Sequence, residues 1–205
     1  MARYCQITIR DYVFPDYAFM KPLHEKVPLM SFINSLSLKS TILGALFFIM
    51  SQTAATAANG TLVLETSQGQ IEIEMLPDVA PNHVARISEL ASSGFYDGII
   101  FHRIISGFMA QTGDPTGTGM GGSGQKLDAE FSDYQYREGT VGMARSMDPN
   151  SGDSQFFICF DGCGHLTGQY TVWGQVSKGM DVVHKLAVGE PPANPDRIIS
   201  AGMAE

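Results

Sequence analysis

The chain of 205 residues is poor in cysteine, tryptophan and positive charge: it has three Cys, one Trp, and 13 Lys and Arg against 21 Asp and Glu. Residues 59–205 hold eight Lys and Arg against 18 Asp and Glu, a net charge of −10. Nucleic-acid binding needs clustered cations that neutralise phosphates, so this acidic segment argues against a nucleic-acid partner. The negative charge favours solubility and identifies no partner by itself.

Three cysteines are too few for a disulfide framework. Cys159 lies in an apolar run and is expected to be a small buried hydrophobic residue. A Cys159–Cys163 bridge also fits the spacing if the protein is exported. The five histidines are isolated from one another and none has zinc-ligand spacing, so no zinc site is expected. A Gly-x-Ser-x-Gly motif is absent as well, which argues against a hydrolase.

No apolar run is long enough to span a bilayer comfortably; the run at residues 42–50 has about nine residues. Lys39 precedes this run, and Ala55-Thr56-Ala57 fits a small-x-small cleavage site. This pattern predicts a secretory signal peptide within residues 1–58, cleaved near 57/58, with Met30 as a candidate true start. The protein would then be periplasmic or secreted and would meet the membrane only through this segment. An uncleaved anchoring helix is the alternative.

From residue 61 the pattern changes to apolar–polar alternation. Residues 62–66 and 70–75 flank a turn and predict a β-hairpin. Pro81 begins a predicted helix with Val84, Ile87 and Leu90 at helical spacing, and Gly94 ends it. Further strands are predicted at 101–105, 109–111, 140–144, 155–159, 171–176 and 197–201, with a second helix at 180–188. Residues 59–205 are therefore predicted to form a mainly β domain, a closed eight-stranded antiparallel β-barrel capped by two α-helices; a sandwich is the alternative.

Residues 101–111 place one cation and one amide among large apolar side chains. Strand alternation predicts Phe101, Arg103 and Ile105 on one face, and Met109 and Gln111 together on a face after the turn. Burying such polar groups costs free energy, which favours a binding site over plain core. The glycine-dense residues 113–124 match a dinucleotide fingerprint by letter, but no βαβ unit encloses them. They are predicted to form a long loop beside the same site.

Several stretches resemble the cyclophilins, a family of peptidyl-prolyl isomerases. They follow that family's order over about residues 60–203, at 101–105, 107–109, 111, 113–114, 117–122, 142–144, 154–158 and 166–174. The resemblance implies an enzyme that isomerises Xaa-Pro bonds during protein folding. It also implies a monomer that binds proline-containing polypeptides and uses neither a cofactor nor a metal.

The resemblance also assigns roles to individual positions. Arg103 would be the catalytic residue. The proline pocket would be lined by Phe108, Met109, Phe157 and Leu166, and the peptide groove by Gln111, Ala144, Arg145, Ser146 and Gln155.

Two rim positions depart from the best-known eukaryotic members. His165 and Tyr170 stand where those proteins usually have tryptophan and histidine. These changes resemble the bacterial-type branch and imply only weak cyclosporin binding. They also motivate an alternative hypothesis, a proline-peptide binding module without catalysis.

Overall fold

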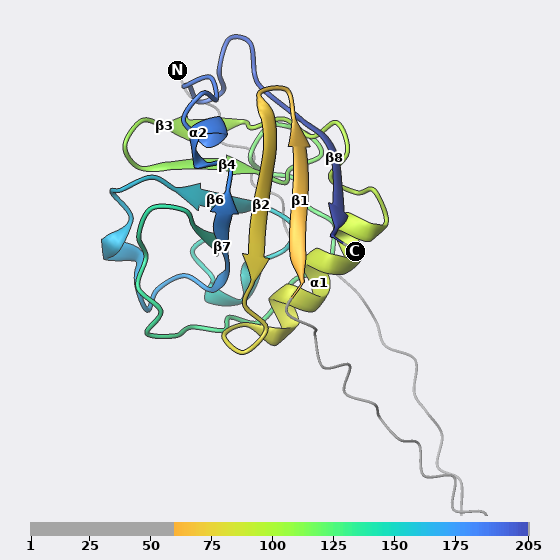
Figure 1. The fold of residues 1–205 in the computed structure, drawn as a ribbon. Helices are drawn as coiled ribbons and strands as arrows, with labels where there is room; N and C mark the ends of the chain where they lie inside the picture. Colours follow the sequence, from red (N-terminus) through yellow and green to blue (C-terminus); the bar gives the residue numbers. More distant parts are fainter. Residues whose placement is uncertain (1–59, 205) are drawn as a thin grey trace, which may run out of the picture. The chain divides into compact units, whose positions relative to one another are not determined.

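A computed structural model describes residues 60–204, which form one antiparallel β-sheet with two α-helices and two 3-10 helices (Figure 1). The predicted signal peptide, its cleavage site and Met30 lie outside this range. Within it, no helix has the length and apolar character needed to cross a membrane.

The predicted hairpin is confirmed as β1 (Thr61–Thr66) and β2 (Gly69–Met75), which pair antiparallel. The other strands are β3 (Arg103–Ile105), β4 (Met109–Thr112), β5 (Thr140–Met143), β6 (Phe156–Cys159), β7 (Val172–Lys178) and β8 (Ile198–Met203). Their order across the sheet is β3-β4-β6-β5-β7-β2-β1-β8. Eight antiparallel strands and a mainly β architecture are as predicted.

The prediction of a closed barrel is wrong: the sheet is an open, curled half-barrel, because β3 and β8 do not pair with each other. The outer edge of β3 bonds instead to a loop, where Ile104 and Gly189 exchange two backbone hydrogen bonds of 2.8 and 3.0 Å. The outer edge of β8 bonds to residues 98–99, with Gly98 and Ile99 each paired with Ile198 at 2.8 Å. Both edges are thus occupied by irregular segments rather than by a closing ladder.

The first helix is confirmed as α1 (Pro81–Ser92), which buries Val84, Ile87 and Leu90 and packs against β8 and β7 (Figure 1). The second, α2 (Met180–Val183), is shorter than predicted. Residues 184–188, which were predicted to continue this helix, are not helical. The Ala187 amide donates to Asp196 instead, and the following Gly189 pairs with β3. Backbone groups used in this way cannot continue a helical ladder.

The middle of the sheet is apolar on both faces. One face packs on the main core, which includes Leu62, Ile73, Phe156 and Trp173. The opposite face of β4 and β6 carries a second buried cluster, consisting of Met109, Tyr136, Phe157, Cys159, Cys163, Leu166 and Val172. All four residues of β6 are buried for this reason, and the second cluster forms the floor of the site described next.

Candidate active site

Strand register aligns the central residues of the site in one row. Arg103 on β3 pairs with Gln111 on β4, Gln111 pairs with Phe157 on β6, and Phe157 pairs with Gly142 on β5. A Cβ atom at Gly142 would lie 2.6 Å from Phe157 Cζ, so a residue without a side chain is needed where the ring crosses β5. The alternation within 103–111 therefore brings Arg103, Met109 and Gln111 to one face, as predicted.

Phe101 does not join that face, contrary to the prediction. The strand begins only at Arg103, and Phe101 is fully buried in the main core. Alternation cannot be extended beyond the residues that are actually paired in a ladder.

Ten of the twelve predicted site residues line one cavity of about 430 Å³. They are Arg103, Phe108, Met109, Gln111, Ala144, Arg145, Phe157, His165, Leu166 and Tyr170. Aromatic contacts order the wall: His165 stacks on Phe108 with ring centroids 5.5 Å apart, and Tyr170 meets Phe157 edge-on at 5.9 Å. His165 is exposed and belongs to the rim, whereas Phe157 and Met109 are buried in the floor.

A chain of polar contacts crosses this apolar cavity. Arg103 donates from Nε to Glu190 at 2.7 Å, and its Nη1 lies 3.5 Å from Gln111 Oε1. Gln111 donates to Gln155 at 2.9 Å, and Gln155 donates to the carbonyl oxygens of Gly119 and Gly121 at 3.0 and 2.8 Å. These contacts connect the arginine to the glycine-rich loop, so that loop borders the site, as the sequence suggested.

The two remaining predicted residues, Ser146 and Gln155, line an adjacent cavity of about 360 Å³. It shares Gln111, Ala144 and Arg145 with the first cavity. Arg145 forms the boundary, with its guanidinium carbon 4.4 Å from the centre of the Tyr170 ring and its nitrogens donating to the carbonyl of Gln169. Because they share these lining residues, the two cavities are adjacent on one surface.

Sequence reasoning missed several residues of the site. Gln169 lines the first cavity, and Asp153, Lys126 and Met120 line the second. Gln169 precedes Tyr170 within residues 166–174, one of the stretches that resemble the cyclophilins, so its position next to a predicted site residue could have indicated it. Glu190 had no such signal, because it lies 87 positions from Arg103 in the sequence.

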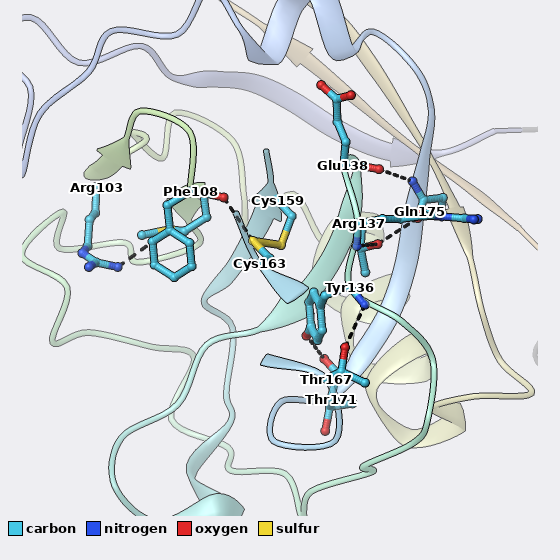
Figure 2. Close-up of a disulfide and its surroundings, with 12 residues drawn as sticks. Arg103, Phe108, Tyr136, Arg137, Glu138, Cys159, Cys163, Thr167, Thr171 and Gln175 are labelled. Carbon is cyan, nitrogen blue, oxygen red and sulfur yellow. Dashed lines mark hydrogen bonds between the residues drawn. A yellow bond between two sulfur atoms is a disulfide. The ribbon is translucent and has the colours of Figure 1, made fainter. Parts of the chain in front are cut away.

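A disulfide joins Cys159 and Cys163 beside Phe108, one of the residues that line the first cavity (Figure 2). Cys159 ends β6, and Cys163 precedes the short 3-10 helix η2 (Gly164–Leu166), which carries two of the lining residues. The Cys163 sulfur is 3.0 Å from the carbonyl oxygen of Phe108. The sequence left open whether Cys159 is a buried thiol or is bonded to Cys163, and the structure shows the bond. The disulfide links the segment that precedes η2 covalently to β6.

Asp114 organises the glycine-rich loop that borders the second cavity. Its buried carboxylate accepts hydrogen bonds from the Thr116 amide at 2.7 Å, the Thr116 hydroxyl at 2.8 Å and the Gly119 amide at 2.6 Å. Burial alone would raise the pKa of Asp114, but these hydrogen bonds outweigh it and lower the pKa to about 2.

An Asp114→Asn variant is expected to lose about 2 kcal/mol of unfolding free energy at pH 7. Because the native pKa is below the ordinary 3.8, this stabilisation is complete well above pH 3.8 and disappears as the pH falls toward 2. Urea unfolding should therefore show a difference of about 1 kcal/mol at pH 3. Asp133→Asn, at an exposed residue, is the control and should change neither value. An equal loss at both pH values would contradict the assignment.

Among residues 60–204, no three His, Cys, Asp or Glu side chains are grouped so as to hold a metal ion. The chemistry available in the cavity is that of fixed donors and apolar surface. Phe157, Met109 and Leu166 provide apolar surface in this cavity, and Arg103 lines the same cavity. The fold and the site thus define a mainly β protein whose concave site combines apolar and aromatic side chains with fixed polar donors.

Comparison with known proteins agrees with this description. Residues 61–203 match the family model for cyclophilin type peptidyl-prolyl cis-trans isomerases. A probable peptidyl-prolyl cis-trans isomerase of Brucella suis is 46% identical over 190 residues, covering 84% of this chain and 96% of that protein. An isomerase of Synechococcus elongatus is 44% identical, covering 67% of this chain and 92% of its own.

Solved structures agree as well. A cyclophilin from Hirschia baltica superposes with a TM-score of 0.64 at 33% identity, covering 70% of this chain and 73% of its own. A cyclophilin type isomerase of Cryptosporidium parvum, crystallised in the presence of the dipeptide Ala-Pro, has a TM-score of 0.66 at 29% identity, covering 71% and 99%. The chain belongs to the cyclophilin-type peptidyl-prolyl cis-trans isomerases, and it is an enzyme of that class.

Proposed function

We propose that this enzyme accelerates Xaa-Pro isomerisation during protein folding, with Arg103 donating a hydrogen bond to the prolyl nitrogen of the twisted transition state. Amide resonance gives rotation a barrier of about 18–20 kcal/mol. When the bond twists, resonance is lost and the nitrogen gains a basic lone pair. A donor aimed at that lone pair stabilises the twisted state more than either planar isomer, which is the condition for catalysis.

The observation that carries this proposal is the guanidinium of Arg103 in the same cavity as the apolar side chains of Phe108, Met109, Phe157 and Leu166. Its Nε is engaged by Glu190 and its Nη1 approaches Gln111, while Nη2 hydrogen-bonds to none of the residues from 60 to 204. The guanidinium is always charged and presents its donors in one plane, so it can donate without any change in its own protonation. Such a donor needs no covalent intermediate.

The surrounding surface supports the same mechanism. Phe108, Met109, Phe157 and Leu166 would hold the pyrrolidine ring while the preceding residue rotates. The groove formed by Gln111, Ala144, Arg145, Ser146 and Gln155 would bind the residues beside the proline. The Cryptosporidium relative crystallised in the presence of Ala-Pro supports a proline-containing peptide as the substrate.

Exchange NMR on an Ala-Pro peptide tests the proposal. The wild-type protein should increase the cis–trans exchange rate, and the Arg103→Ala variant should largely abolish the increase. If the wild type bound the peptide without changing its exchange rate, the binding-module hypothesis would replace this one.

We also propose that the protein is exported to the periplasm or secreted. The apolar run at 42–50 followed by Ala55-Thr56-Ala57 supports a cleaved signal peptide. The Cys159–Cys163 bridge supports the same proposal, since structural disulfides persist mainly in oxidising compartments.

Mass spectrometry of the mature protein, expressed from its full sequence in a bacterial host, tests export. The expected N-terminus lies near residue 58, with Cys159 and Cys163 oxidised. Recovery of a chain that still begins before Ala55, with both thiols free, would contradict the proposal. A variant with Ala55 and Ala57 changed to bulky leucine should accumulate uncleaved, which controls for trimming by other proteases.

A further inference from the structure

Glu190 has no role in the proposed mechanism, yet it makes the shortest contact with Arg103. Its carboxylate accepts from Arg103 Nε at 2.7 Å. The residue lies in the loop between α2 and β8, 87 positions after Arg103 in the sequence. The question is whether this contact is an incidental surface ion pair or part of the site.

The fold holds the backbone of Glu190 in place. Gly189, the preceding residue, exchanges two hydrogen bonds with Ile104, which follows Arg103 on β3. Gly189 has a φ of +152°, and a Cβ there would lie 2.6 Å from Pro192 Cα, so only glycine fits. Gly189 and Ile104 form an antiparallel bridge, so the residue after Gly189 lies opposite the residue before Ile104. Glu190 therefore has to lie near Arg103.

Hydrogen bonds to Asp196 hold the same loop at a second point. Asp196 accepts hydrogen bonds from the Ala187 amide at 2.8 Å, from Ser67 at 2.6 Å and from Gln68 at 2.8 Å. Burial opposes the ionisation of Asp196, but these hydrogen bonds lower its pKa below the ordinary value, so the carboxylate stays charged near neutral pH. The loop that presents Glu190 is thus attached at both of its sides.

The position of the contact on the guanidinium determines what it can do. Glu190, which does not line the cavity, accepts from Nε, whereas Nη1 lies 3.5 Å from Gln111 and 3.8 Å from Met109, which both line it. Arginine has several rotatable bonds and loses rotamer entropy when it is fixed in one orientation. A carboxylate on Nε restricts the guanidinium while leaving Nη2 without a partner among residues 60–204 and Nη1 with only long contacts to Gln111 and Met109.

We propose that Glu190 is a positioning residue, which holds the Arg103 guanidinium by its Nε so that the Nη groups face the bound proline. The inference rests on the proposed function of Arg103. It concerns orientation rather than stability, because Arg103 and Glu190 side chains are 37% and 52% exposed and such pairs contribute little to folding.

Kinetics of Glu190→Ala and Glu190→Gln test this role. Glu190→Ala should lower kcat by about tenfold with KM changed less than about twofold, since orientation matters most in the transition state. Glu190→Gln keeps an oxygen that can accept from Nε and should recover a large part of kcat. Thermal unfolding of both variants should match the wild type. Asp181→Asn, which breaks the exposed Lys185 ion pair on α2, is the matched control and should leave kcat unchanged.

A double-mutant cycle separates positioning from an indirect effect. In an Arg103→Ala background, Glu190→Ala should cause no further loss of kcat. Wild-type kcat in Glu190→Ala, or the same tenfold loss in both backgrounds, would overturn the inference while leaving the role of Arg103 standing. If Arg103→Ala itself kept the full rate, the proposed mechanism would fall first and the role of Glu190 with it.

Discussion

Replacing Arg103 with alanine is expected to lower kcat by about 100- to 1,000-fold, the loss seen when one fixed donor to a transition state is removed. KM should change by less than about threefold, because the planar ground states offer no basic nitrogen to this donor. Steady-state isomerisation of an Ala-Pro peptide, followed by exchange NMR or a protease-coupled assay, measures both constants.

Three comparisons make that result specific to the guanidinium. Arg103→Lys keeps the charge but loses the planar set of donors, so its kcat should be intermediate. Arg137→Ala removes an exposed arginine away from the pocket and should have wild-type kinetics. The unfolding free energy of Arg103→Ala should be within about 1 kcal/mol of the wild type, since the Glu190 pair is exposed. Wild-type kcat in Arg103→Ala would refute the mechanism.

Truncation of Phe157 to alanine is expected to cost about 3–5 kcal/mol of unfolding free energy and most of the isomerase activity. The side chain is 4% exposed, stacks on Tyr136 with centroids 5.8 Å apart and forms the floor of the pocket. Its removal leaves a void that the paired strands cannot close. Urea unfolding and kcat/KM on the same preparation measure the two losses.

Two conservative variants distinguish an activity loss caused by the missing pocket contact from one caused by lower stability. Phe156 and Phe157 are neighbours on β6, but Phe156 faces the main core and Phe157 faces the site. Phe156→Leu and Phe157→Leu should each cost about 1 kcal/mol of stability. Only Phe157→Leu should lower kcat/KM, mainly by raising KM. Equal activity losses in the two variants would show that Phe157 acts through stability alone.

The strands of this protein were predictable because alternation is a local property. In β1 and β2 the apolar residues recur every second position, and a short turn joins them. The end of α2 was not predictable, because the residues after Val183 have helical spacing but are bound by Asp196 and by β3. The closed barrel was wrong for a similar reason: a short β3 gives its free edge to Gly189.

The site was predictable where its residues lie in recognisable stretches. Arg103, Met109 and Gln111 stand two to eight positions apart, and residues 154–158 and 166–174 supplied the opposite wall. Ser146 and Gln155, predicted together with the other groove residues, line the second cavity. The Cys159–Cys163 bridge stayed undecided, since the spacing allows a bridge or two buried thiols.

By itself, the sequence determined the strands, the first helix and most of the residues that line the first cavity. Side-chain type and a spacing of two or about four residues are enough for those conclusions. Only the tertiary structure decided that Arg103, Gln111, Phe157 and Gly142 form one row, and that Glu190 meets Arg103. Strand register and the positions of loops depend on the combined free energy of many contacts between residues far apart in the sequence. A local sequence pattern therefore cannot predict them.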